Sequence, residues 1–180
     1  NDLFAAYELM KTQELNLNNF LNAHAIITKN ILPKSQQGLL RNSPMVVMNG
    51  EGKIEYVATD PSLVKSEINK LFHDIDMLLS MDLDEYEVLY YSAQIHFWFV
   101  KIHPFYDGNG RAGRLLEKWF LVSHFKEKGF ALQTEKSYYQ NLQAYYKNLR
   151  ISGFEYEDTD FSKAINFMLM SSKAIIDNNK

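Results

Sequence analysis

Residues 103–114, HPFYDGNGRAGR, concentrate one histidine, one acid, three glycines and two arginines in a chain that has only eight glycines. The stretch lies between two segments in which apolar residues recur at helical spacing, 83–102 and 111–129. Pro104 disfavours helical geometry at His103, so we expect the first helix to end there. The sequence therefore predicts a glycine-rich loop between two helices, with the second helix beginning at the end of the stretch.

Helical periodicity also predicts most of the other elements of the chain. Further helices are expected within about 1–32, where Pro33 ends the second of two, and at 62–79, 137–153 and 160–179. Asp60 is expected to cap the helix at 62–79, and Gly129 is expected to end the helix at 111–129. Because the segment 83–102 leaves almost no polar face, its helix belongs in the middle of a bundle.

One segment carries a clear β signal. In 45–58, two β-prone runs flank the turn-forming residues 49–52, which indicates a hairpin. The predicted fold is an all-α helical bundle with one β-hairpin, formed by residues 1–180 as a single domain.

The composition of the chain excludes several classes of function. The formal net charge of −3 provides no basic field for capture of nucleic acid, so no nucleic-acid partner is expected. No apolar run is long enough to suggest a membrane span. The absence of cysteine suits a reducing compartment, and we expect a cytoplasmic location. The chain begins at Asn1 without an initiator methionine, which leaves room for a further segment upstream.

The glycine-rich stretch combines the groups that an anion site needs. Its glycines let successive backbone N–H groups turn toward one point, and the start of the next helix adds unpaired donors. Arg111 and Arg114 lie three residues apart, hence on one helix face, where both can bind phosphate oxygens. Asp107 suits such a site if a divalent cation such as Mg²⁺ lies between it and the phosphates. His103 could accept a proton from an attacking hydroxyl, so the set indicates phosphoryl or nucleotidyl transfer.

Simpler interpretations of the same residues were weighed. Gly108 to Gly113 is formally G-x-G-x-x-G, but a dinucleotide-binding fold needs a preceding strand and a βαβ unit, and neither is evident. Taken singly, His103 is more often a helix-terminating residue and Asp107 a turn residue. Their clustering in twelve positions favours a functional site.

The stretch resembles the active-site motif of the Fic family, H-x-F-x-[DE]-G-N-G-R-x-x-R, and matches it at every fixed position. The segment QQGLLRNSP, the hairpin and the following helix also resemble the Fic lead-in and its target-docking flap. Family members similar to this chain are helical bundles that transfer AMP from Mg·ATP to a hydroxyl side chain of a protein, which is called AMPylation. The resemblance thus implies a Fic-type bundle and a protein adenylyltransferase.

The resemblance implies a role for each residue of the motif. His103 would deprotonate a target Ser, Thr or Tyr hydroxyl, Phe105 would anchor the loop in the core, and Asp107 would hold Mg²⁺. The phosphates would be bound by the backbone at Gly108, Asn109 and Gly110 and by the side chains of Arg111 and Arg114. Glycine at 110 favours AMP transfer, since some relatives with lysine there phosphorylate instead.

Contacts outside the motif are implied less directly. Tyr139 stands where the family has a tyrosine that meets the nucleoside, and Tyr146 stands where an asparagine is usual. Helical tyrosines are also common packing residues. A target segment would add to the edge of the hairpin, with Met45, Val47 and Tyr56 as side-chain contacts.

The resemblance raises the question of inhibition. Many Fic proteins carry an (S/T)-x-x-x-E-(G/N) helix whose glutamate pairs with the second motif arginine, here Arg114. The nearest match in this chain, Lys173 to Asn178, has lysine where Ser or Thr belongs and the shorter acid Asp177, so we reject it. An inhibitory helix upstream, a separate antitoxin-like partner and no inhibition all stay open.

Two alternatives to AMP transfer from ATP also stay open. The chain could be a non-catalytic nucleotide-binding or protein-docking module, or it could use the same chemistry with another nucleotide or diphosphate donor. The target protein and the oligomeric state are not indicated. His96 is assigned to the core, and the other histidines show no spacing that suggests a zinc site.

Overall fold

The computed structural model describes residues 2–177, with side chains described to residue 171. Its helices are α1 (Asp2–Thr12), α2 (Leu17–Ile27), α3 (Val64–Ser80), α4 (Glu85–Ile102), α5 (Asn109–Phe125), α6 (Glu127–Ala131), α7 (Thr134–Gln140), α8 (Leu142–Ile151) and α9 (Ile165–Asp177), with a short 3₁₀ helix at Phe161–Lys163. The strands β1 (Val46–Met48) and β2 (Ile54–Val57) form an antiparallel pair. The predicted helical bundle with one hairpin is confirmed.

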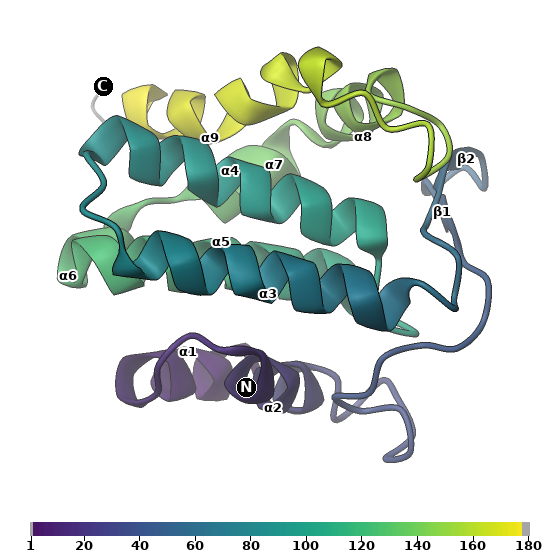
Figure 1. Ribbon diagram of the computed structural model, residues 1–180, viewed down its shortest axis with the longest axis horizontal. Coiled ribbons are helices and arrows are strands. Elements are labelled where there is room, and N and C mark those ends of the chain that lie inside the picture. The colour runs from purple at the N-terminus through teal and green to yellow at the C-terminus, as the bar shows by residue number, and fades with distance from the viewer. Residues whose placement is uncertain (1, 178–180) are drawn as a thin grey trace.

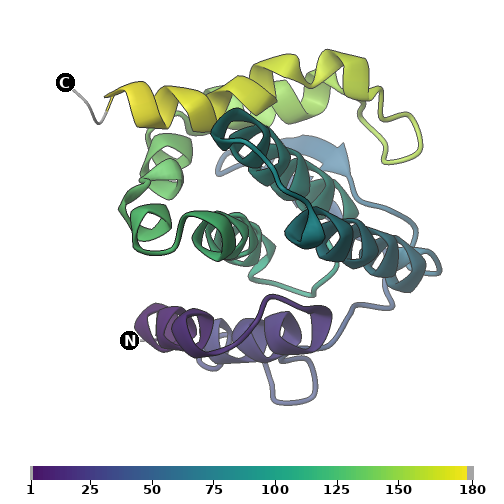
Figure 2. The same cartoon turned by 60° about the vertical axis from the view of Figure 1, so that its left-hand side comes forward.

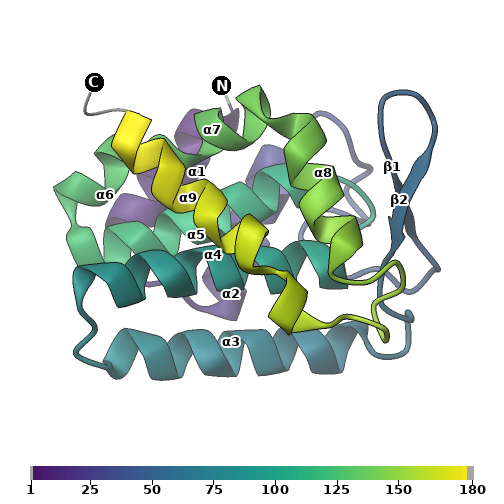
Figure 3. The same cartoon turned by 90° about the horizontal axis from the view of Figure 1, so that it is seen from above.

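The helices lie in layers around α4 and α5. Figure 1 shows α1 and α2 below, α3, α4 and α5 in the middle, and α8 and α9 above, with the hairpin at one end. Helix α4 packs against α3, α5 and α9, as Figure 2 also shows, so it is the central helix that its nearly continuous apolar pattern predicts. Seen from above in Figure 3, α9 crosses over α4 and the hairpin projects beyond the bundle beside α8.

The central helix α4 begins with a capping box formed by side chains of its first turn. Asp84 accepts hydrogen bonds from the N–H groups of Tyr86 and Glu87, and the Glu87 carboxylate accepts one from the Asp84 N–H. This reciprocal capping box satisfies donors that the first turn of a helix otherwise leaves unpaired.

Two predicted helix ends in the first half of the chain were wrong. Helix α2 ends at Ile27 rather than near 32, because Thr28 leaves helical geometry and its hydroxyl donates to the His24 carbonyl. Helix α3 begins at Val64 without a side-chain cap. Asp60 instead caps the turn before it, where its carboxylate accepts the N–H of Ser62.

Two predicted helices in the second half are each divided. Helix α5 ends at Phe125 because Lys126 has a positive φ of 54°. Gly129 does not end a helix but lies inside α6, where a Cβ atom would come within 2.7 Å of the Val122 Cα. The segment 137–153 forms α7 and α8, which separate at Asn141, whose backbone leaves helical geometry. Local periodicity did not indicate these breaks, since apolar spacing continues across both.

The hairpin has the predicted turn and an irregular register. The side chain of Asn49 accepts the N–H groups of Glu51 and Lys53, and Gly52 has a φ of 76°. Val47 pairs with Tyr56, and a register shift follows between Val47 and Met48. On β1, strand alternation buries Val47 between the exposed Val46 and Met48. On β2, Ile54 is exposed, whereas Glu55 and Tyr56 are both buried.

The rejected inhibitory match at 173–178 lies outside the residues whose side chains are described. Among the described residues, no helix combines the length and the apolar character that crossing a membrane requires.

Candidate active site

The end of α4 is the first part of the site. In a regular helix the Val100 carbonyl would accept the N–H of residue 104, but Pro104 has no N–H. The Tyr56 hydroxyl from β2 donates to this carbonyl instead, at 2.6 Å. The hairpin thereby supplies a hydrogen bond that the sequence of α4 cannot make for itself.

A buried arginine from the lead-in segment holds the same helix end. Arg41 Nε donates to the His103 carbonyl at 2.7 Å, and Nη2 donates to the carbonyls of Thr59 and Ile102 at 2.7 and 3.1 Å. Nη1 donates to the Ser43 carbonyl at 2.7 Å. Four carbonyl groups from three segments therefore converge on one guanidinium. Arg41 could not be predicted from the sequence, because nothing local distinguishes it from an exposed arginine.

His103 is held in an uncommon backbone conformation. It is the C-cap of α4, with a φ of 52° and a ψ of 60°, in the left-handed region that non-glycine residues seldom occupy. The hydrogen bond from Arg41 to its carbonyl stabilises this conformation. Such backbone strain is typical of functional sites, where the surrounding contacts impose it.

The hydrogen bonds around His103 select one form of its ring. The Tyr56 hydroxyl gives its proton to the Val100 carbonyl, so its oxygen is free to accept from His103 Nδ1, which lies 3.3 Å away. With the proton on Nδ1, the Nε2 atom carries a lone pair. Desolvation lowers the pKa of His103 to about 4, and the Arg41 charge acts in the same direction. The ring is therefore neutral at pH 7 and able to accept a proton at Nε2.

Tyr56 thus has a different place from the one predicted. Its side chain is only 1% exposed, so the expectation that it contacts a docked target is wrong. It points inward, where its hydroxyl reaches the Val100 carbonyl at the end of α4. Val47 is also buried and faces inward beside His103, whereas Met45 is partly exposed.

Removal of the Tyr56 hydroxyl tests this assignment. Tyr56→Phe keeps the ring but removes both the donor to Val100 and the acceptor for His103. For the group transfer that the motif implies, we expect kcat to fall about tenfold, the value of one hydrogen bond of ordinary strength, with KM for the nucleotide little changed. The control is Tyr86→Phe, at an exposed tyrosine at the far end of α4. An unchanged kcat for Tyr56→Phe would show that the hydroxyl does not orient His103.

Buried packing and hydrogen bonds within the loop hold the segment between α4 and α5 in place. Phe105 is fully buried against Phe20 and Phe99. The Asn109 side chain accepts the Phe105 N–H at 2.9 Å and donates to the Phe105 carbonyl at 2.8 Å. Gly108 is the N-cap of α5, with a φ of 80° and no side-chain cap. The first backbone N–H groups of α5 therefore have no partner inside the helix and can bind an anion.

The two arginines of the loop differ in their surroundings. Arg111 Nη1 donates to the carbonyl of Ile27, at the C-terminal end of α2, at 3.0 Å. Arg114 lines a small cavity of about 90 Å³ together with His103 and Gly110. It also lines a second hollow of about 360 Å³, which Arg111 shares. A larger hollow of about 630 Å³ lies between α1, α3, α5 and α6, but no loop residue lines it, so volume alone does not identify the site.

Asp107 has the properties of a ligand for a cation bound mainly by its substrate. The side chain is exposed, and one carboxylate oxygen accepts the Gly108 N–H at 2.5 Å, which leaves the other free. No cluster of three or more metal-ligating side chains occurs among the described residues. A single carboxylate fits Mg²⁺, which commonly takes one or two protein oxygens and completes its shell with phosphates and waters.

The tyrosines of α7 and α8 complete the small cavity. Tyr139 is 81% exposed and Tyr146 is half-buried, and both line the cavity beside Arg114. Their neighbours Tyr138 and Tyr145 are buried and serve mainly in packing. The structure therefore brings the two predicted nucleoside contacts to the same cavity as His103.

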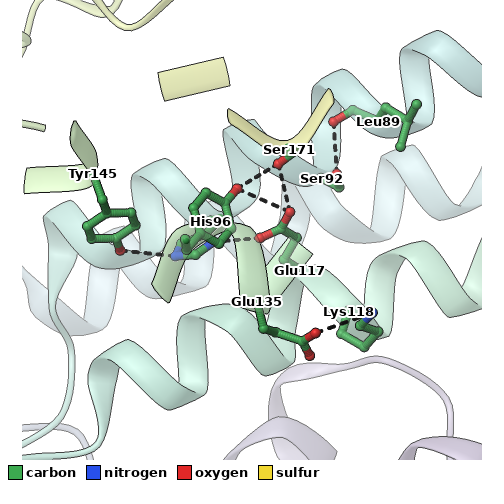
Figure 4. A network of polar contacts seen from close by, with 9 residues as sticks. Leu89, Ser92, His96, Glu117, Lys118, Glu135, Tyr145 and Ser171 are labelled. Carbon is green, nitrogen blue, oxygen red and sulfur yellow. Dashed lines mark hydrogen bonds and ion pairs between the residues drawn. The ribbon is translucent and has the colours of Figure 1, made fainter. Parts of the chain in front are cut away.

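Beneath this cavity lies a buried polar network (Figure 4). His96 Nδ1 is 2.6 Å from a Glu117 carboxylate oxygen, and Nε2 is 3.1 Å from the Tyr145 hydroxyl. The other Glu117 oxygen accepts from the hydroxyls of Tyr138 and Ser171. The prediction that His96 belongs to the core is confirmed, and its network joins α4, α5, α7, α8 and α9 under the site.

The loop joins a histidine with a free Nε2 to an uncapped helix N-terminus and two arginines, the groups that the Fic motif brings together. The sequence model of the Fic/DOC family matches residues 14–121, and the chain belongs to that family. It is 26% identical over 144 residues to the protein adenylyltransferase Fic of Nematostella vectensis, an alignment that covers 79% of this chain and 31% of the relative. It is 40% identical over 81 residues to a Fido domain-containing protein of Dictyostelium discoideum, with coverage of 44% and 52%.

Solved structures show the same fold. A Fic family protein from Desulfovibrio desulfuricans superposes with a TM-score of 0.73 at 22% identity, over 99% of this chain and 53% of the other. A Fic domain containing signaling protein from Bacteroides thetaiotaomicron superposes with a TM-score of 0.66 at 18% identity, over 96% and 66%. The chain spans only 31% and 52% of the lengths of the two curated relatives that it matches.

Proposed function

We propose that the chain is a protein adenylyltransferase that transfers AMP from ATP to a hydroxyl side chain of a target protein. The observation that carries the proposal is that His103, in the form with a free Nε2, lines the same cavity as Gly110 and Arg114. A pure binding site needs the anion-binding groups but has no need of a neutral base beside them. The name of the relative from Nematostella vectensis supports the same activity.

In the proposed reaction, His103 activates the incoming hydroxyl. The target oxygen attacks the α-phosphorus of ATP, and its proton passes to His103 Nε2. The bond between the α-phosphorus and the oxygen that bridges to the β-phosphate breaks, and pyrophosphate leaves with that electron pair. The positive charges of Arg111 and Arg114 and the N–H groups at the start of α5 stabilise the charge that develops on the phosphates.

The two hollows that Arg114 lines provide the space for the nucleotide. They measure about 90 and about 360 Å³, and the larger one is within the range of about 300–1,000 Å³ typical of ligand sites. We assign the nucleoside to the side of Tyr139 and Tyr146 and the outer phosphates to the side of Arg111. Asp107 would hold Mg²⁺, which neutralises phosphate charge when bound.

The target segment would lie along the hairpin. We propose that it pairs with the free edge of β1 and so brings its hydroxyl toward His103. Val47 lies nearest to the catalytic cavity, and Met45 remains a proposed contact. The structure adds the exposed side chains of Val46 and Met48 on β1, which alternate with Val47. An antitoxin-like partner or inhibitory helix that covers Arg114 stays a proposal.

Mass spectrometry tests the proposed function. The protein is incubated with lysate proteins, Mg²⁺ and ATP, and in parallel with GTP, CTP, UTP and a diphosphate-containing donor. We expect adducts with the mass of AMP on Ser, Thr or Tyr residues. Adducts from another donor would correct the identity of the nucleotide, and Mg·ATP binding without any adduct would favour the non-catalytic module.

The pH dependence follows from the low pKa of His103. The base must be neutral, so activity is lost as the pH falls through its pKa. We expect kcat/KM, which reports the free enzyme, to stay level from pH 8 to about 5 and to fall by half near pH 4, the pKa of the desolvated His103 ring. The bound triphosphate raises the pKa of His103, so kcat should fall at a higher pH than kcat/KM does. A half-fall in kcat/KM near 6.5 would contradict a desolvated ring.

A further inference from the structure

A second histidine, His24, also contacts the active-site loop. His24, on α2, is fully buried, and its ring stacks on that of Phe105 with centroids 3.5 Å apart and an angle of 10° between the planes. Its Nδ1 accepts the Gly38 N–H at 3.0 Å, and its Nε2 lies 2.9 Å from the Asp107 carbonyl oxygen. The proposed reaction does not use this residue.

The two partners of the His24 ring determine where its proton lies. The Gly38 N–H can only donate, so Nδ1 must be unprotonated. The Asp107 carbonyl can only accept, so Nε2 must carry the hydrogen. Because both partners are backbone groups, neither can reverse its role. The ring is thus a neutral connector between the lead-in segment and the loop.

The carbonyl that His24 holds belongs to the same peptide unit as the Gly108 N–H. In a trans peptide the C=O and N–H bonds point in opposite directions, so the direction of the carbonyl also determines that of the N–H. This N–H donates to the Asp107 carboxylate. The position of the carboxylate thus depends on His24 through one rigid peptide.

Close packing leaves this peptide little freedom. A Cβ atom on Gly108 would come within 2.7 Å of Thr28 Cγ2 and 3.3 Å of His24 Nε2, so α2 lies directly against the loop. Arg111 also donates to α2, at the Ile27 carbonyl. The last turns of α2 therefore contact the loop at the glycine, at the acid and at the first arginine.

We propose that His24 is a positioning residue that orients the Asp107–Gly108 peptide and thereby presents the Asp107 carboxylate to Mg·ATP. The proposal rests on the proposed function for the identity of the ligand. The His24 ring itself touches neither nucleotide nor target. Its contribution is to hold the peptide in the binding orientation before the ligand arrives, which reduces the ordering that binding requires.

Two substitutions of His24 by amide side chains of different length test the proposal. The side-chain nitrogen of glutamine extends about as far as Nε2, so His24→Gln can still donate to the Asp107 carbonyl. The amide of asparagine extends only as far as Nδ1, so His24→Asn cannot. We expect His24→Asn to weaken Mg·ATP binding in calorimetry about tenfold and His24→Gln to stay within about threefold of the unmodified protein, the difference that one hydrogen bond makes.

Two further measurements do not depend on ligand or activity. Hydrogen exchange of the Gly108 amide should accelerate about tenfold in His24→Asn but not in His24→Gln, because opening of the peptide frees this N–H. The ¹⁵N spectrum of the unmodified protein should show His24 with its proton on Nε2. Equal Gly108 exchange in the two variants, with both folded, would overturn the proposal, as would a proton on Nδ1. Absence of AMP transfer alongside the expected exchange difference would overturn the proposed function and leave the role of His24 intact.

Discussion

Replacement of His103 by asparagine is expected to reduce the proposed AMP transfer at least about a hundredfold, the usual contribution of a general base. Asparagine is the sharpest replacement because it tolerates the left-handed backbone conformation that residue 103 adopts, with its φ of 52°. Its amide has no basic lone pair at neutral pH, so the proton acceptor is lost while the loop keeps its shape. Turnover with saturating ATP and target measures the effect.

Binding and stability measurements give this experiment its controls. Mg·ATP affinity should change little in His103→Asn, because the anion is bound by the α5 N-terminus and the arginines. The histidine control is His73→Asn, at an exposed position on α3 remote from the loop. Transfer by His103→Asn at the rate of the unmodified protein would disprove the assignment of the base.

Replacement of Arg41 by methionine is expected to produce the largest loss of stability. The change keeps an unbranched side chain but removes the donors to the carbonyls of Ser43, Thr59, Ile102 and His103. Each buried carbonyl left without a partner costs about 1–3 kcal/mol, and water can reach some of the four, so we expect the free energy of unfolding to fall by about 3–5 kcal/mol. Urea denaturation measures this difference at a constant m-value.

Two companion variants sharpen the Arg41 experiment. Arg41→Lys keeps the charge but replaces the planar fork by one ammonium group, which cannot serve all four carbonyls, so an intermediate loss is expected. Lys34→Met, at an exposed position in the same segment, should change stability by less than about 0.5 kcal/mol. If Arg41→Met resembled Lys34→Met, the four hydrogen bonds would have no net value for folding.

Local sequence signals explain why α4, α5 and the loop between them could be predicted. The apolar pattern of 83–102 has no polar face, and the proline after His103 disfavours continuation of the helix. The hairpin was likewise predicted from its turn residues. The C-terminal end of α2 and the division between α7 and α8 could not be predicted, because single residues, Thr28 and Asn141, end those helices within an uninterrupted apolar pattern.

The functional groups of the active-site loop could likewise be predicted from the sequence, since the motif places the proposed base, the acid, the glycines and the arginines within twelve adjacent residues. The residues that hold the loop in place could not be predicted from the sequence. Arg41 lies 62 residues from His103, Tyr56 lies 47 residues from it, and His24 lies 83 residues from Asp107. Tyr56 was even assigned to the surface, because the pattern of a short strand does not show which of its faces is covered.

Sequence patterns are thus enough to predict the helical bundle, the place of the loop and the chemical groups that it offers. How those groups are held follows from the packing of the fold: which nitrogen of His103 is free, what fixes its strained backbone, and what orients the Asp107–Gly108 peptide. The physical reason is that helix periodicity and turn formation depend on neighbours a few residues apart. Hydrogen bonds from buried side chains to a distant backbone depend on packing that no local pattern encodes.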